Sequence, residues 1–339
     1  MDRVPALGAS ELLARFVPPR RFSAVRFSTY RPDPAHPSQA AAKEAMEAFA
    51  ASIVVPEPNR RWGRRRRPAP DAGPPGRYLD GGYGVGKTHL LAALWHAAEV
   101  PALYLSFEEL TATVGFLGMG TAVSAFSSGS SGSSARLLCI DEFELDDVAN
   151  TLLAVSFLRG VIAQGVRVAA TSNALPDRLG QGRFNADDFT REIAAIAVHF
   201  DTVRIDGPDY RKRSGIEAAT LDDDRLSDLA RSAEGRVAFD GFDELLAHLR
   251  RIHPVQFAAL LDGLDAVFIR GLHPIENQGS ALLFVQLVDE LYDAEITVAA
   301  SGCAVNEIFP PTYRGGGYRK KYGRAESRLA AMLLEATVA

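Results

Sequence analysis

The chain has 339 residues, of which 47% are hydrophobic, and 37 Lys and Arg against 42 Asp and Glu give it a formal net charge of −5. This length and composition allow a sizeable core and two or so domains, and the acidic balance argues against a chain devoted to nucleic acid. Two cysteines are too few for a disulfide framework or a zinc site, and no apolar run is long enough to span a membrane. We therefore expect a cytoplasmic protein without an integral membrane segment.

The first 75 residues predict an extension ahead of the main folded region. An alanine-rich pattern over residues 38–52 favours a helix, and prolines interrupt the segment around it. An arginine-rich run follows, and it could bind the phosphates of DNA, RNA or anionic lipid, or it could be a solvated loop. The acidic balance of the whole chain favours the loop. The arginines of this run are Arg60, Arg61, Arg64, Arg65, Arg66 and Arg67.

A short apolar strand, a glycine loop and a helix follow one another around residues 78–99. Gly81, Gly86, Lys87 and Thr88 fit the pattern G-x-x-x-x-G-K-[ST] of a phosphate-binding loop. We expect Lys87 to reach the β- and γ-phosphates of ATP and Thr88 to ligate Mg²⁺, while the helix directs its positive end at the same anion. The predicted nucleotide contacts are Gly81, Gly82, Tyr83, Gly84, Val85, Gly86, Lys87, Thr88 and His89.

A segment made almost entirely of Ser and Gly, residues 124–134, predicts a mobile loop inside the core region. A solvated insertion and a substrate loop are both compatible with this composition, and the first is the simpler interpretation.

The next strand, residues 136–140, ends in Asp141 and Glu142. At the carboxyl edge of a parallel sheet, Asp141 is placed to hold Mg²⁺ and Glu142 to orient and polarise the attacking water. Acidic residues can instead cap a helix, and we assign that role to Asp146 or Asp147. The acidic pair therefore predicts hydrolysis as well as binding.

A third strand, residues 166–170, leads into Thr171, Ser172 and Asn173. The amide of Asn173 can hydrogen-bond the γ-phosphate or the water, which makes it a candidate sensor. The same residues are also common in ordinary turns.

Several segments together resemble the ZapE family of bacterial cell-division ATPases and its mitochondrial AFG1-like relatives, a branch of the AAA+ enzymes. They read LCIDEF at 138–143, DVA at 147–149, ATSN at 170–173, DYR at 209–211, VDELYD at 288–293 and SRL at 327–329. The resemblance covers residues 76–334. It implies an oligomer-forming enzyme that hydrolyses ATP and acts with the division machinery in bacteria or in protein quality control in mitochondria.

Resemblance to AAA+ enzymes also implies arginines that contact the γ-phosphate, one across a subunit boundary and one within the chain. Arg183 and Arg191 are the candidates for the first role. Arg328 is the candidate for the second, with Arg324 one turn before it. A surface ion pair is an equally good interpretation of any one of these arginines.

The C-terminal region alternates strand and helix patterns, with strands expected at 264–270 and 295–301 and a helix at 281–293. We expect these strands to extend or cover the central sheet. Residues 298–301 read VAAS and resemble VAAT at 168–171, but Cys303 stands where Asn173 would be, and we attribute the likeness to chance between buried strands.

The predicted fold is α/β: a P-loop NTPase of the AAA+ type, with a parallel sheet flanked by helices over residues 76–215. An N-terminal extension occupies 1–75, and a lid or mixed α/β region occupies 216–339. The leading function is Mg-ATP hydrolysis coupled to remodelling of a protein partner, by a nucleotide-dependent homo-oligomer. A helicase-loader-like ATPase that associates with nucleic acid, suggested by the loader-like run from Gly86 to Leu90 and by the arginines, and a slow nucleotide-gated scaffold are the alternatives.

Overall fold

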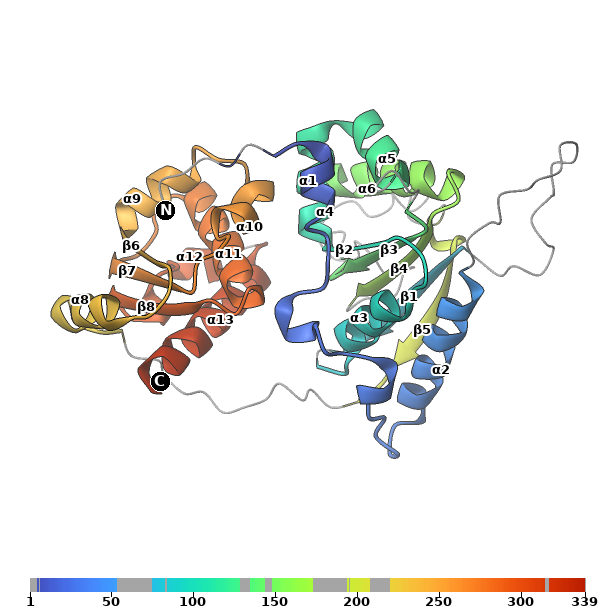
Figure 1. Cartoon of the computed structure of the whole chain (residues 1–339), viewed down its shortest axis with the longest axis horizontal. Coiled ribbons are helices and arrows are strands. Elements are labelled where there is room, and N and C mark those ends of the chain that lie inside the picture. The colour runs from blue at the N-terminus through green and yellow to red at the C-terminus, as the bar shows by residue number, and fades with distance from the viewer. Residues whose placement is uncertain are drawn as a thin grey trace, which may run out of the picture. The chain divides into compact units, whose positions relative to one another are not determined.

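The computed structural model describes residues 5, 7–53, 75–82, 84–128, 135–143, 148–172, 194, 196–207, 220–314 and 317–338. The chain forms two compact units (Figure 1). The P-loop unit comprises Gly8–Pro18 and Phe22–Arg213, and the C-terminal unit comprises Met1–Leu7, Pro19–Arg21 and Ser214–Ala339.

The P-loop unit is built on a five-stranded sheet with the order β2-β3-β4-β1-β5, and every described strand pair in it is parallel. Its three central strands are almost entirely buried, as expected when helices cover both faces of a parallel sheet. The predicted fold class is therefore confirmed. The strands are β1 (Gly76–Gly81), β2 (Ala102–Ser106), β3 (Leu137–Asp141), β4 (Arg167–Ser172) and β5 (Phe200–Ile205).

Helices of the P-loop unit begin where local sequence favours them. Pro37 opens α2 at a position where a missing N–H costs nothing, and the Ser106 side chain accepts a hydrogen bond from the Glu109 N–H at the start of α4. The helices are α1 (Ala9–Leu13), α2 (Pro37–Ser52), α3 (Lys87–Ala97), α4 (Phe107–Leu117), α5 (Met119–Ser128) and α6 (Val148–Ala163), with the 3₁₀ turn η2 (Phe27–Thr29). A further 3₁₀ turn, η1 (Arg20–Phe22), has its first two residues in the C-terminal unit and its last in the P-loop unit.

The mobile loop predicted over residues 124–134 is partly wrong. Residues 124–128 form the last turn and a half of α5, where Phe126 is buried and packs edge-on against Phe157 of α6. Burial of the Phe126 ring against Phe157 stabilises this part of the helix, although most residues of the segment are Ser and Gly. Residues 129–134 lie outside the described part of the chain.

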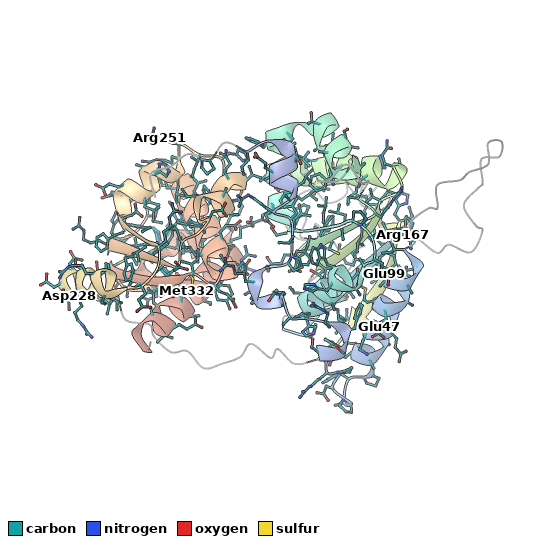
Figure 2. The ribbon with its side chains drawn as sticks, viewed as in Figure 1. Glu47, Glu99, Arg167, Asp228, Arg251 and Met332 are labelled. Carbon is teal, nitrogen blue, oxygen red and sulfur yellow. The ribbon has the colours of Figure 1, made fainter. Side chains whose placement is uncertain are left out.

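Most of the described N-terminal segment belongs to the P-loop unit, whereas its sequence predicted an extension ahead of the core. Met46 and Phe49 of α2 are buried in the same apolar cluster as Leu79 and Leu90. Arg167 of β4, labelled in Figure 2, lies 4.8 Å from the centre of the Phe49 ring. Helix α2 therefore covers part of the central sheet.

The C-terminal unit contains a second parallel sheet with the order β6-β7-β8. Its α/β character is as predicted, but its strands do not extend the central sheet, because they pair with one another in a sheet of their own. The alternative expectation, that they cover the central sheet, stays a prediction. The strands are β6 (Val237–Gly241), β7 (Ala266–Leu272) and β8 (Thr297–Gly302). The helices are α8 (Asp223–Ser232), α9 (Phe242–Leu249), α10 (Phe257–Leu260), α11 (Gln278–Asp293), α12 (Pro311–Arg314) and α13 (Arg319–Val338), with 3₁₀ turns η5 (Pro254–Gln256) and η6 (Val305–Glu307).

A large buried cluster holds the C-terminal unit together. Phe284 of α11 packs against Phe242 and Phe309, and Phe309 packs in turn against Tyr322 of α13.

No single helix in the described ranges is long and apolar enough to cross a membrane, although the sharply bent pair α4 and α5 would pass on length and composition alone.

A glycine substitution tests how tightly β8 is packed at its end. Gly302 has φ +110°, and a Cβ added there would lie 2.3 Å from the N and O atoms of Leu272. We expect Gly302→Ala to lower the free energy of unfolding of this unit by about 2–4 kcal/mol, because backbone strain and a clash with main chain add together. Urea denaturation of the full chain measures the loss.

Gly271→Ala is the matched control. Gly271 has φ +78°, but a Cβ there would meet nothing within 4 Å, so we expect the backbone term alone, about 1 kcal/mol. Equal losses in the two variants would show that β8 adjusts freely around Leu272.

Candidate functional site

The phosphate loop joins the end of β1 to the start of α3. Gly86 has φ +94°, and a Cβ there would lie 2.7 Å from the Tyr30 ring, so both conformation and packing require glycine. The helix begins at the next residue, Lys87, and its first backbone N–H groups lie at the end of the loop. A loop at the start of a helix is an arrangement in which backbone N–H groups can bind an anion, and anion binding here stays a prediction.

Lys87 is buried at the base of this loop. Its Nζ atom donates hydrogen bonds to the carbonyl oxygens of Gly81, at 2.9 Å, and Gly82, at 2.6 Å. A phosphate bound in the loop would be attracted by the positive charge of this ammonium group.

Asp141, at the end of β3, accepts hydrogen bonds from three hydroxyl groups. The Thr88 hydroxyl lies 3.2 Å from Oδ1, the Tyr104 hydroxyl lies 3.1 Å from Oδ2, and the Thr171 hydroxyl also donates to Oδ1. Burial, followed by the charge of Glu142, raises the pKa of Asp141, and the three hydroxyls act in the opposite direction by stabilising the charged carboxylate. Helix α3 and strands β2 and β4 thus converge on one carboxylate.

This donor set fits Mg²⁺. The carboxylate of Asp141 and the hydroxyl of Thr88 are within hydrogen-bonding distance of each other and are oxygen ligands of the kind that Mg²⁺ prefers. Magnesium commonly takes one or two protein carboxylates and completes its shell with water and substrate phosphates. A phosphate group in the adjacent loop would therefore complete the site.

Glu142 follows Asp141 in a conformation that is uncommon for a residue with a side chain, with φ +53°. Its backbone N–H donates to the Thr171 hydroxyl at 3.0 Å, and the next N–H, of Phe143, donates to the Thr171 carbonyl at 2.7 Å. The buried Phe143 ring packs edge-on against Phe107 and Tyr78. These contacts hold the turn in place, so the position of Glu142 is fixed by the core.

Sequence reasoning missed the N-terminal residues that contact the phosphate loop. The Tyr30 hydroxyl donates to the Val85 carbonyl at 3.3 Å, and the Tyr30 ring lies edge-on to His89. His89 Nε2 is 3.0 Å from the Thr29 hydroxyl oxygen, and burial lowers the pKa of His89 against the effect of a hydrogen bond to the Arg26 backbone. Because the two segments are about 60 residues apart, no local pattern signals these contacts.

Tyr104 was also missed as a site residue. It lies in the middle of β2, directly beside Cys139 of β3, two residues before Asp141. An apolar strand with one tyrosine gives no sign that its hydroxyl meets a carboxylate on the next strand.

Asp80 is a further unpredicted buried charge beside the loop. Its side chain is 3% exposed and is paired with Arg204 of β5, whose Nη1 lies 2.7 Å from Asp80 Oδ2. This ion pair joins β1 to the edge strand next to the phosphate loop.

The remaining predicted site residues divide into two groups. Arg328 lies on α13 in the C-terminal unit, where its Nη1 is 2.7 Å from Asp289 Oδ1 and its guanidinium lies over the Tyr292 ring. Arg324 binds the other oxygen of Asp289, also at 2.7 Å. Arg328 therefore forms an ion pair with Asp289, as one of its two interpretations expected. A contact between Arg328 and phosphate stays a prediction. Outside the described residues lie Tyr83, Asn173, Arg183, Arg191, the arginine-rich run and both candidate helix caps, Asp146 and Asp147.

Comparison with known proteins identifies a matching family. The family model described as AFG1-like ATPase matches residues 9–237 and 223–339. The cell division protein ZapE of Escherichia coli K12 is 35% identical over 83 residues, which make up 24% of this chain and 22% of that protein. The match thus spans about a fifth of the length of this relative.

Among solved structures, DnaI aligns with a TM-score of 0.42 and 20% identity, covering 57% of this chain and 94% of DnaI. A putative primosome component from Streptococcus pyogenes serotype M3 aligns with a TM-score of 0.41 and 18% identity, covering 60% and 97%. These are low overall similarities.

Gly86→Ala tests the packing of the phosphate loop. We expect its affinity for a fluorescent ATP analogue to fall at least about tenfold, because a side chain at this φ costs about 1–3 kcal/mol and also meets the Tyr30 ring. Gly118→Ala, at φ +78° with open space around it, is the control and should bind as the wild type does. Unchanged affinity in Gly86→Ala would mean that the loop does not hold the nucleotide in this conformation.

Proposed function

Because this chain belongs to the AFG1-like ATPase family, we propose that it binds ATP in the phosphate loop and hydrolyses it to ADP and phosphate. The observation that supports this most strongly is the convergence of the Thr88, Tyr104 and Thr171 hydroxyls on Asp141. This cluster adjoins a loop that contains a buried lysine.

Binding would use charges that are already in position. The ammonium of Lys87 and the first N–H groups of α3 would contact the β- and γ-phosphates of ATP. Thr88 and Asp141 would hold Mg²⁺, which when bound supplies positive charge that offsets charge on the phosphates during transfer. Lys87 would then exchange its contacts with Gly81 and Gly82 for contacts with phosphate oxygens.

Hydrolysis would depend on Glu142. Phosphoryl transfer requires a positioned water and stabilised charge more than it requires covalent help from the protein. The fixed turn at Glu142 suits a general base that orients this water. We assign Asn173 to hydrogen-bonding of the γ-phosphate or water, and Arg183 or Arg191 and Arg328 to stabilising the transferred charge, as proposals from the sequence.

We propose that the ATPase acts on a protein partner. Similarity to a cell division protein supports a partner in the division machinery. We propose that ATP hydrolysis drives the remodelling of this partner. We further propose a homo-oligomer whose assembly depends on nucleotide. In many such enzymes an arginine from a neighbouring subunit supplies positive charge that stabilises the γ-phosphate during transfer.

Glu142→Gln tests the assignment of the general base. We expect the variant to bind ATP with wild-type affinity and to lose turnover by about 10²- to 10⁴-fold, because an amide cannot accept the proton from water. Steady-state phosphate release measures turnover. Light scattering in each nucleotide state should show a larger assembly trapped with ATP.

Two variants serve as controls for this experiment. Glu99→Gln changes an exposed carboxylate just after α3 (Figure 2) and should leave turnover unchanged, while Lys87→Ala should lose ATP binding. ATP binding with no turnover that depends on Glu142 would favour the nucleotide-gated scaffold over the ATPase.

Neutralising Arg64, Arg65, Arg66 and Arg67 together separates the protein-remodelling function from a nucleic-acid-associated one. We expect the affinity for single-stranded DNA, and its slope against salt concentration, to change little, because the chain as a whole is acidic. Fluorescence anisotropy over a salt series measures both quantities. A steep salt dependence in the wild type that the substitutions abolish would support the loader-like alternative.

A further inference from the structure

The C-terminal unit repeats the order of elements of the P-loop unit. In the P-loop unit, β2, α4, α5, β3, α6 and β4 follow one another, and the strands lie in the order β2-β3-β4. In the C-terminal unit, β6, α9, α10, β7, α11 and β8 follow one another in the same way, with the 3₁₀ turn η5 before α10, and the strands lie in the order β6-β7-β8. In both units the first helix begins directly at the end of the first strand, at Phe107 and Phe242, and both rings are buried.

Backbone hydrogen bonds at the helix-to-strand turns also correspond. After α6, Gly165 has φ +83°, and the N–H of the next residue, Val166, donates to the Val161 carbonyl at 3.1 Å. After α11, Glu295 has φ +55°, and the N–H of Ile296 donates to Leu291 at 3.1 Å. The same turn therefore follows the corresponding helix in each unit.

The carboxyl edges of the two sheets share a more specific contact. The residue that follows Asp141, Glu142, has a positive φ and donates its N–H to the Thr171 hydroxyl at 3.0 Å. The corresponding Gly271 also has a positive φ and donates its N–H to the Ser301 hydroxyl at 3.1 Å. Residues VAAT and VAAS, which end in Thr171 and Ser301, thus occupy equivalent places in β4 and β8.

Even the strand that carries the phosphate loop has a counterpart. Leu79 of β1 lies beside Thr171 of β4, and Leu221 forms a parallel bridge with Ser301 of β8. Helix α8 follows Leu221 as α3 follows β1. Both helices cover the same face of their sheets, where Leu226 of α8 packs on Ala266, Phe268 and Ala299.

The phosphate loop itself is missing from the C-terminal unit. Leu79 and Lys87, the first residue of α3, are eight residues apart in the sequence, whereas Leu221 and Asp223, the first residue of α8, are two residues apart. In place of a glycine loop, the side chain of Asp222 accepts the Arg225 N–H at 2.8 Å and caps the helix. Asp223 and Asp224 follow in the first turn, so three carboxylates stand where a bound phosphate would require positive charge.

Residues at the carboxyl edge of the sheet also differ between the units, and their charges are reversed there. Arg270 of β7 occupies the position of Asp141, and Phe239 of β6 occupies that of Tyr104, by the pairing of the strands. Accordingly, the Ser301 hydroxyl donates to Asp223 on α8, while the Thr171 hydroxyl donates to Asp141 on β3. An arginine in this place would repel Mg²⁺, and acids at the helix start would repel phosphate.

We propose that the C-terminal unit is a second copy of the ATPase fold that has lost nucleotide binding, so that the chain binds one nucleotide. This rests on the proposed function of the P-loop unit for the single site that remains. Three contributions to binding Mg-ATP are therefore absent from the C-terminal unit. They are the glycine loop, the positive charge of Lys87, where Asp223 stands, and the negative charge of Asp141, where Arg270 stands.

Isothermal titration calorimetry of the full chain with a slowly hydrolysed ATP analogue and Mg²⁺ tests the proposal. We expect about one equivalent per chain at ligand concentrations up to about 1 mM, the upper end of usual KM values. A second equivalent would overturn the proposal. No binding at all would contradict the proposed function of the P-loop unit while agreeing with a nucleotide-free C-terminal unit.

Variants at corresponding positions of the two units show which unit holds the bound nucleotide. Asp141→Ala should weaken binding of the Mg²⁺ complex at least tenfold, whereas Arg270→Ala, at an exposed position of β7, should leave stoichiometry and affinity unchanged. Circular dichroism checks that both variants fold. An equivalent that is lost in Arg270→Ala and retained in Asp141→Ala would place the nucleotide in the C-terminal unit and overturn the proposal.

Discussion

The carboxylate of Asp141 is the point on which the site is organised. It is partly withdrawn from water and lies next to a second carboxylate, and both conditions disfavour its charged form. Hydroxyls from α3, β2 and β4 stabilise that charge. Tyr104 and Thr171 reach Asp141 because β2 and β4 are the two neighbours of β3 in the parallel sheet. The order of the strands, with β3 between β2 and β4, is therefore a requirement of the chemistry as much as of the core.

The phosphate loop depends on a segment far from it in the sequence. Tyr30 packs against Gly86 and binds the Val85 carbonyl, and α2 is buried beside β1 and β5. A glycine-rich loop has many accessible conformations when unfolded, so contacts that select one of them reduce the entropy lost when a ligand binds. The N-terminal segment thus prepares the loop for its anion.

Two units with one chain order carry opposite charges at the same edge. The P-loop unit places Lys87 and Asp141 there, and the C-terminal unit places Asp223 and Arg270 there. Buried residues of the two sheets remain alike, because packing between strands and helices sets them regardless of any ligand. Edge residues are free of that constraint, and they are where the two units differ.

The sequence by itself determined the phosphate loop, the acidic pair after β3, the parallel α/β class and the strand and helix pattern of the C-terminal region. These features are local: glycine spacing, apolar runs and helix caps report the conformation of their own neighbourhood. Only the tertiary structure decided that Tyr104 reaches Asp141, that Tyr30 contacts the loop, and that β6, β7 and β8 form a separate sheet. Strand pairing and contacts between distant residues depend on which apolar faces pack together, and a single sequence carries no short-range signal for that choice.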